Sequence, residues 1–398
     1  MTQDIRADYG LRPVINASGT MTSLGASIVV PAAVDAITRL LPQFVEIGDL
    51  HKLASRTIAE LTGGEAGFVT ASCSAAISLA VAAAITGDNL LAIERLPDTG
   101  MLKNEVLIQS GHMVGYGAPV EQAIRMAGGK VIPVGQATKA NAYQLELSIT
   151  DKTAAAVFVV SHHVVDYGQI PLTTFARICR AKGVKVIVDA ASEYDFRKFL
   201  SEGADVVLYS GHKFLGGPTS GICAGEKTFI RDIYLQNRGI GRGMKVGKEG
   251  IIGVIAALEA WKTRDHEGIR KREQAALDVW VEALAGRPGV DAVIVPDPTD
   301  NPLDRIKVTI DPEVARITAW DLASALASGD RPVVVRDHET EHGHFFLDPC
   351  NLHPGEEHVV AARLVEELER ALRSNEQIRT DLHQRWLDDE AAILNWPD

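Results

Sequence analysis

Three short stretches of the chain carry residue types that together could perform amine chemistry. They are TASCSAA at 70–76, VIVDAAS at 186–192 and VVLYSGHK at 206–213. The second stretch places a carboxylate, Asp189, after an apolar run, and the third places a primary amine, Lys213, after another. The first has small residues and hydroxyl groups at the start of a predicted helix, where main-chain N–H groups bind anions.

A lysine, an aspartate and an anion site are the groups that pyridoxal 5'-phosphate requires from a protein. The lysine holds the aldehyde of the cofactor as a Schiff base. A carboxylate beside the ring nitrogen keeps the ring protonated, so that it withdraws electrons. We therefore predict Lys213 as the Schiff-base lysine, which later moves the proton, and Asp189 as the partner of the ring nitrogen.

Other side chains complete the predicted cofactor site. The phosphate turn is predicted to consist of Ala71, Ser72, Cys73 and Ser74. Ser210, shortly before the lysine, offers a further hydroxyl, and His112, after the strand at 104–110, is predicted to cover the ring face. Taken singly, such residues are more often turn, capping or packing residues. Their combination and order favour the cofactor.

Alternating strands and helices are predicted to position these residues. Strands are expected at 67–70, 104–110, 130–134, 154–160, 184–190 and 204–209, and helices at 50–62, 74–85, 120–129 and 175–183. Continuous Val/Ile/Ala strands separated by helices indicate an α/β fold with a mostly parallel sheet covered on both faces. Ligands of such sheets bind at the carboxyl ends of the strands. The three stretches lie at such ends.

The pattern changes in the last third of the chain. Strands at 290–295, 305–310, 333–336 and 344–348 and helices at 318–328 and 356–373 indicate a smaller α+β domain. We predict an N-terminal segment (1–49) packed on the body, a large cofactor-binding domain (50–264), the small domain (265–373) and a C-terminal tail (374–398).

Composition and charge restrict the class of protein. The chain has 398 residues and a formal net charge of −12, without a block of Lys or Arg, so nucleic acid is not expected as the main partner. We expect no secretory signal peptide and no membrane span, because the first ten residues contain no apolar core and no apolar run reaches membrane-spanning length. Its four scattered cysteines suit a reducing cytoplasm. No cluster has metal-ligand spacing, and HETEHGH (338–344) is interpreted as a polar turn, so no metal is predicted.

On these motifs the chain resembles the fold type I pyridoxal-phosphate enzymes, and among them the group of selenocysteine synthase (L-seryl-tRNA(Sec) selenium transferase). The resemblance covers about residues 10–373. It is carried by the three stretches above, extended at the lysine to SGHKFLGGPTSGI (210–222), and by VINASGTMTSLG (14–25) and RPVVVRDHETEHGHFFLDPCNLHPGEE (331–357). Selenium transferases usually carry Asp where this chain has His212, and we expect their additional tRNA-binding domain to be missing.

These departures and the acidic charge favour the small-molecule members of the group, similar to D-glucosaminate-6-phosphate ammonia-lyase. The resemblance implies a lyase that removes water and ammonia from a 2-amino-3-hydroxy acid, and a homodimer or larger homo-oligomer with active sites at the interface. It also implies that Arg336 binds the substrate carboxylate, for which a planar guanidinium is suited.

Further candidates come from the residues themselves. His212 and His163 are predicted to assist proton transfer to the leaving group. Arg242 and Lys245, in a glycine-rich basic loop, are predicted to bind a phosphate of the cofactor or the substrate; a solvated turn is the alternative. A racemase, an aldolase or an aminotransferase would use the same cofactor. A selenium transferase and a cofactor-free binding protein are the remaining alternatives.

Overall fold

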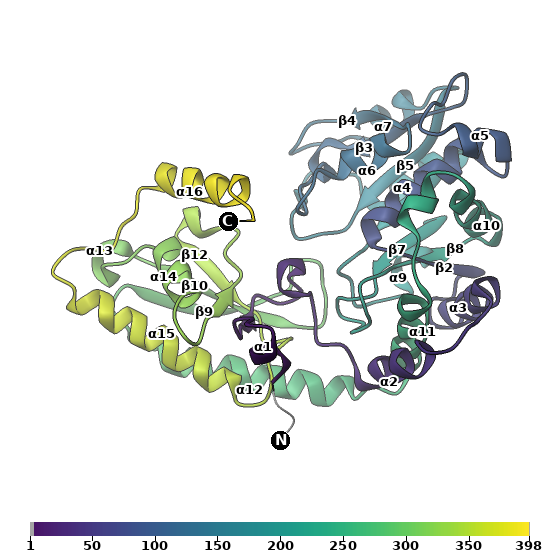
Figure 1. Cartoon of the computed structure of the whole chain (residues 1–398). Coiled ribbons are helices and arrows are strands. Elements are labelled where there is room, and N and C mark those ends of the chain that lie inside the picture. Colours follow the sequence, from purple (N-terminus) through teal and green to yellow (C-terminus); the bar gives the residue numbers. More distant parts are fainter. Residues whose placement is uncertain (1–3, 398) are drawn as a thin grey trace. The chain divides into compact units, whose positions relative to one another are not determined.

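A computed structural model describes residues 4–397, which divide into two compact units (Figure 1). The large unit comprises residues 28–264. The small unit combines residues 4–27 with residues 265–397. The predicted N-terminal segment, 1–49, is thus shared between the two units. None of the helices in the described part of the chain is both long enough and apolar enough to cross a membrane.

A seven-stranded sheet forms the centre of the large unit, in the order β2-β8-β7-β6-β5-β3-β4 (Figure 1). Its strands are β2 (Ala66–Thr70), β3 (Glu105–Gln109), β4 (Lys130–Val134), β5 (Thr153–Val159), β6 (Lys185–Asp189), β7 (Val206–Ser210) and β8 (Gly221–Gly225). Neighbouring strands from β7 to β4 are parallel, and only the pairs made by β8 are antiparallel. The prediction of a mostly parallel sheet is confirmed.

Two hydrophobic cores cover the two faces of this sheet. Because successive side chains of a strand point to opposite faces, Val186 and Val188 of β6 enter one core and Ile187 enters the other. The first core includes side chains of α2 (Pro31–Leu40), α3 (Ile47–Thr62), α7 (Ala142–Ser148), α8 (Leu172–Ala181), α9 (Lys198–Ser201) and α11 (Lys248–Lys262). The second includes side chains of α4 (Cys73–Thr86), α6 (Val120–Met126) and α10 (Lys227–Leu235). α5 (Leu90–Arg95) follows α4 in the chain.

The sequence did not lead us to expect β8, because its segment, GICAG, begins and ends with glycine, which is unfavourable inside strands. The structure explains why glycine is required at the first of these positions, Gly221. Gly221 pairs with Thr70 on one side and with Ser210 on the other. A Cβ atom at this position would collide with the carbonyl oxygen of Ser72 and the hydroxyl of Thr70. Glycine therefore lets the strand approach the turn between β2 and α4.

The small unit is built on an antiparallel sheet in the order β12-β10-β9 and on a short parallel pair, β1-β11. Its strands are β1 (Ile15–Ala17), β9 (Val290–Pro296), β10 (Asp304–Ile310), β11 (Val333–Val335) and β12 (His344–Leu347). Its helices are α1 (Ile5–Asp8), α12 (His266–Leu284), α13 (Pro312–Ala315), α14 (Ala319–Leu326), α15 (Glu356–Arg373) and α16 (Leu382–Leu394). Trp280, Phe345 and Leu364 are fully buried in its core. The predicted small α+β domain is confirmed.

A buried ion network holds the sheets of the small unit together. The guanidinium of Arg305 forms ion pairs with Asp348, at 2.7 Å, and with Asp297. All three side chains are buried. Burial would raise the pKa of Asp348, but the charge of Arg305 and the hydrogen bond from the Cys350 N–H hold it below its usual value. The main-chain N–H of Asp348 also donates to the carbonyl of Ala17, at the end of β1.

Replacing Arg305 by methionine should lower the free energy of unfolding by about 3–5 kcal/mol, because two buried carboxylates lose their counter-charge. Denaturant-induced unfolding measures this change. Lys271→Met is the matched control in the same unit: its ion pair with Glu267 is exposed, and such pairs contribute at most about 1 kcal/mol. Equal effects of the two substitutions would contradict the structural role of the network.

Candidate active site

The predicted cofactor residues lie at one end of the large sheet, where β2, β6 and β7 finish. β6 and β7 are neighbours, with Asp189 in register with Leu208. Ser210, the last residue of β7, is in register with Gly221, which is in register with Thr70, the last residue of β2. The sheet thus brings the three stretches of sequence together although more than a hundred residues separate the first from the other two.

Asp189 is the buried anionic group at this end of the sheet. Its side chain is 7% exposed. The thiol of Cys73 donates a hydrogen bond to its Oδ1 atom at 3.4 Å, and the N–H of Ala191 donates to the same oxygen at 3.3 Å. Burial raises the pKa of Asp189, while the Cys73 hydrogen bond and the charge of Lys213 act in the opposite direction.

Lys213 lies half-buried in the tight turn that follows β7. Burial raises the pKa of both Asp189 and Cys73, and the charge of Lys213 opposes this shift at each of the two groups. The turn folds back on itself: the N–H of Gly217 donates to the Gly211 carbonyl at 2.7 Å, and the N–H of Gly216 donates to that of Lys213 at 2.9 Å. Gly216 has a φ of +72°, which favours glycine. These bonds fix the main chain that carries the lysine.

The start of α4 provides the predicted phosphate turn. Ser72 caps the helix, since its hydroxyl accepts a hydrogen bond from the N–H of Ala75 at 3.0 Å. The first N–H groups of a helix have no partner within it, so they are available to an anion. The hydroxyl of Ser74 lies 3.0 Å from the hydroxyl of Tyr116. Ser210 is buried at the end of β7, in register with Gly221 of β8. Its main-chain N–H donates a hydrogen bond to the carbonyl of Ala191.

Tyr116 is a candidate site residue that the sequence interpretation missed. The only signal was a phenol within the glycine-rich segment MVGYGAP that follows β3. Its contact with Ser74 joins residues that are 42 positions apart. Burial raises the pKa of the Tyr116 hydroxyl, so the group stays neutral at the edge of the predicted phosphate turn and can donate or accept a hydrogen bond there.

His112 is fixed within the core. Its Nδ1 atom accepts a hydrogen bond from the main-chain N–H of Val159 at 3.1 Å, and its ring meets the Phe158 ring edge to face at a centroid distance of 4.5 Å. Burial lowers its pKa to about 4. The structure therefore describes a neutral imidazole held in one orientation at the end of β3. Its role at the ring face stays a prediction.

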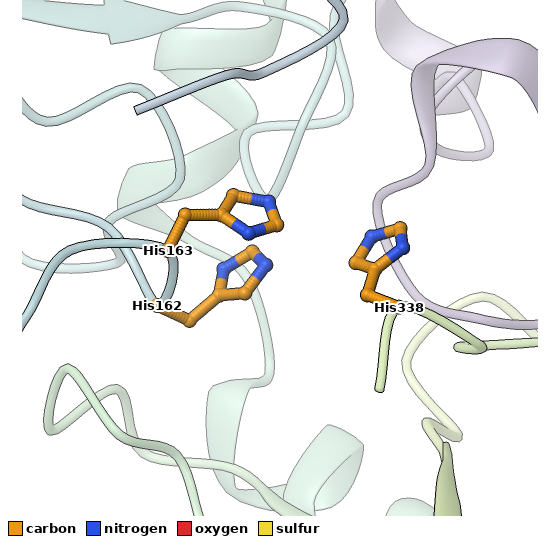
Figure 2. A group of neighbouring side chains, drawn as sticks. All are labelled: His162, His163 and His338. Atoms are coloured by element: carbon orange, nitrogen blue, oxygen red, sulfur yellow. The ribbon is translucent and has the colours of Figure 1, made fainter. Parts of the chain in front are cut away.

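The two predicted proton-transfer histidines differ in environment. His212 is buried, and burial together with the charge of Lys213 lowers its pKa. His163 is exposed in the loop after β5, where its ring lies against that of His162 at a centroid distance of 3.8 Å (Figure 2). His338, also drawn in Figure 2, belongs to the small unit. The roles of His212 and His163 in proton transfer stay predictions.

The predicted substrate residues lie in both units. Arg242 and Lys245 are exposed in the large unit, within and directly after the 3-10 helix Ile240–Met244. Arg336 follows β11 in the small unit, and its main chain exchanges two hydrogen bonds of 2.9 Å with Phe346. Burial and the charge of Arg305 lower the pKa of Arg336. Among residues 4–397, its guanidinium finds no hydrogen-bond or ion-pair partner, which suits an anion-binding role.

We predict that the stability of the protein falls as the pH decreases from about 6.5 to 4, partly because of His112. Its pKa is lower in the folded chain than its usual value, so in this range the unfolded chain binds more protons. The shift corresponds to a loss on the order of 3 kcal/mol. Unfolding free energies measured at several pH values check this.

His112→Asn is the informative variant, because asparagine retains an acceptor for the N–H of Val159 but does not titrate. Its stability should decrease less steeply with acid. Burial lowers the pKa of His51 to about 4 as well, so a double variant with His51→Asn should flatten the profile further. An unchanged slope in both variants would contradict the assignment of this pH dependence to these two rings.

Comparisons with known proteins place this geometry in a family. The model of the family "L-seryl-tRNA selenium transferase" matches residues 14–272. D-glucosaminate-6-phosphate ammonia lyase from Salmonella typhimurium is 38% identical over 371 residues, which cover 93% of this chain and all of the relative. A solved structure of D-glucosaminate-6-phosphate ammonia-lyase matches with a TM-score of 0.84, covering 94% of this chain and 100% of that one. A 5'-C-glycyluridine monooxygenase-decarboxylase from Streptomyces sp is 35% identical, with 90% of each chain covered.

Proposed function

The chain belongs to the L-seryl-tRNA selenium transferase family, and we propose that within this family it is an ammonia-lyase for a small 2-amino-3-hydroxy acid of the amino-acid or amino-sugar-acid type. The observation that carries the proposal is the hydrogen bond from Cys73, at the start of α4, to Asp189, at the end of β6, with Lys213 in the turn after the neighbouring strand β7. The identity with an ammonia lyase over that enzyme's full length supports the reaction class.

Pyridoxal 5'-phosphate is the cofactor, and the residues present fit it. Asp189 would pair with the ring nitrogen, and Lys213 would bind the aldehyde. The start of α4, with Ser72 and Ser74, would bind the phosphate. Because Gly221 has no side chain, no Cβ atom at this position crowds the turn between β2 and α4. When bound, the cofactor withdraws electrons from the Cα atom of the substrate and makes its proton acidic.

The chain's own groups then move protons and orient the substrate. Lys213 accepts the Cα proton at its Nζ atom. Asp189, as a buried carboxylate, stabilises positive charge at the ring nitrogen. His212 or His163 delivers a proton to the departing hydroxyl at Cβ, and Arg336 holds the substrate carboxylate by a bidentate contact. Water is released and then consumed by hydrolysis of the enamine, so the net products are a 2-keto acid and ammonia.

Oxidative decarboxylation is the second candidate. It is supported by the 35% identity with the monooxygenase-decarboxylase over most of both chains. This reaction would consume dioxygen and release carbon dioxide, neither of which elimination requires. Racemisation, retro-aldol cleavage and amino transfer remain as outcomes that product analysis distinguishes. A tRNA substrate is disfavoured by the net charge of −12.

We propose that the protein binds a small-molecule substrate, forms a homo-oligomer and acts in the cytoplasm. Trp386, Ile393 and Leu394 are all exposed on the single helix α16, and a group of large exposed apolar side chains favours association with another surface. The four cysteines are free thiols, which suits a reducing compartment.

The purified protein should release equimolar ammonia and 2-keto acid from a 2-amino-3-hydroxy acid such as D-glucosaminate 6-phosphate, without consuming dioxygen. Lys213→Ala should reduce this rate by at least about 1,000-fold, because the variant lacks the amine that moves the Cα proton. Coupled assays for ammonia and for the keto acid, together with an oxygen electrode, measure both outcomes.

Lys182→Ala, at an exposed position after α8, is the matched control and should retain full activity. Borohydride reduction followed by peptide mapping should place the pyridoxyl group on Lys213. Carbon dioxide release with oxygen uptake would replace the elimination proposal by oxidative decarboxylation, and labelling of another lysine would overturn the role of Lys213.

Replacing Arg336 by alanine should raise KM about 10- to 100-fold while kcat changes less, because charged hydrogen bonds of this kind contribute about 1.5–3 kcal/mol to binding. Arg336→Lys should recover part of the loss, since it restores the charge without the bidentate geometry. Steady-state kinetics measure the effect. Arg331→Ala, an exposed arginine before β11, should leave KM unchanged, and a similar KM for both alanine variants would refute carboxylate binding by Arg336.

A further inference from the structure

Both hydrogen bonds that the side-chain carboxylate of Asp189 receives converge on one of its oxygen atoms. The Cys73 thiol and the Ala191 N–H donate to Oδ1. Within residues 4–397 no hydrogen bond reaches Oδ2. A carboxylate with one oxygen held by two donors has a restricted side-chain torsion, so that its second oxygen is presented in a single direction.

We propose that Cys73 is a positioning residue, whose thiol holds Oδ1 of Asp189 and thereby directs Oδ2 at the ring nitrogen of the cofactor. This inference rests on the proposed function, because it assumes that Asp189 is the partner of that nitrogen. It assigns to Cys73 a role that is distinct from phosphate binding. The thiol touches the carboxylate and acts through it.

The flanking residues explain why Cys73 is the one that faces the sheet. Ser72 caps α4 through the N–H of Ala75, and Ser74 contacts the Tyr116 hydroxyl. Both hydroxyls of the turn are thus engaged with its own elements or with the loop after β3. Cys73, the first residue of α4, lies between them with its side chain 6% exposed and its sulfur on Asp189.

The protonation state of Cys73 agrees with this role. Burial and the neighbouring charge of Asp189 raise the pKa of its thiol, so Cys73 retains its proton and acts as a donor. A thiol is a weak donor. It therefore orients the carboxylate while leaving it basic enough to bind the proton of the ring nitrogen.

The alternative is a packing role, in which Cys73 only fills space in the second core. Cys223 of β8 provides a test of this alternative, because it is a fully buried cysteine of the same core and makes no hydrogen bond to Asp189. A packing role predicts similar effects for the two cysteines. A positioning role predicts an effect for Cys73 alone, and rescue by a side chain of similar size that can donate.

The experiment compares Cys73→Ala, Cys73→Ser and Cys223→Ala in the full chain. The dissociation constant of pyridoxal 5'-phosphate is measured by titrating the cofactor into the apoprotein, and the pH dependence of its visible absorption is recorded. Cys73→Ala should bind the cofactor about 5- to 20-fold more weakly and shift the pH profile. Cys73→Ser should stay within about 3-fold of the parent protein, and Cys223→Ala should match it. Equal effects of the two alanine variants, or none, would overturn the proposal.

Asp189→Asn separates the inference from the function on which it rests. If Asp189 binds the ring nitrogen, Asp189→Asn weakens cofactor binding, and adding Cys73→Ala to it has no further effect on the dissociation constant. If Asp189→Asn leaves binding and the spectrum unchanged, the cofactor role of Asp189 fails and the inference fails with it. If Asp189→Asn weakens binding while Cys73→Ala does not, only the positioning role of Cys73 is overturned. Should Cys73→Ala fold poorly, Cys73→Val removes the donor and keeps the volume, and the same outcomes apply.

Discussion

A carboxylate buried at the end of a central strand is the constraint on which the large unit depends. Asp189 is almost inaccessible to solvent, and a buried charge is costly unless hydrogen bonds and an opposite charge compensate for it. The compensating groups are the Cys73 thiol, the Ala191 N–H and the charge of Lys213. Because Cys73 and Lys213 come from other segments, the charge is tolerated only when β2, β6, β7 and β8 are in their native order. The same burial supports the proposed pairing of this carboxylate with the ring nitrogen of the cofactor.

Close approach of the main chain is the second requirement, and glycine satisfies it. At Gly221 a side chain would meet the Ser72 carbonyl, and at Gly211 it would meet the Ser220 hydroxyl. These two positions lie on either side of the lysine turn. They allow β7, the turn and β8 to form a narrow hairpin against the start of α4. The antiparallel strand β8 therefore contributes space and rigidity to the site, although it carries none of its predicted chemistry.

Local patterns were sufficient to predict most of the large sheet and the positions of Asp189 and Lys213 at the carboxyl ends of its strands, while the roles of these two residues stay predictions. Each parallel strand is a continuous apolar run, and Asp189 and Lys213 were identified because each follows such a run. The contacts that depend on tertiary register were not predictable. β8 is hidden by its glycines, and the Cys73–Asp189 bond joins residues 116 positions apart. β1 is three residues long and pairs with β11 across most of the chain, so it has no local signal.

Two arginines of the small unit, Arg305 and Arg336, differ in their carboxylate partners. Arg305 is neutralised by Asp297 and Asp348, which it binds directly. Arg336 is influenced by the same charges, yet burial and Arg305 lower its pKa, and among the described residues no carboxylate pairs with it. A guanidinium in this situation gains from any anion that approaches it, because the anion offsets both the desolvation and the repulsion from Arg305. Because Arg305 binds both carboxylates of the ion network, neither of them pairs with Arg336, which supports the proposed role of Arg336 in binding the carboxylate of a substrate.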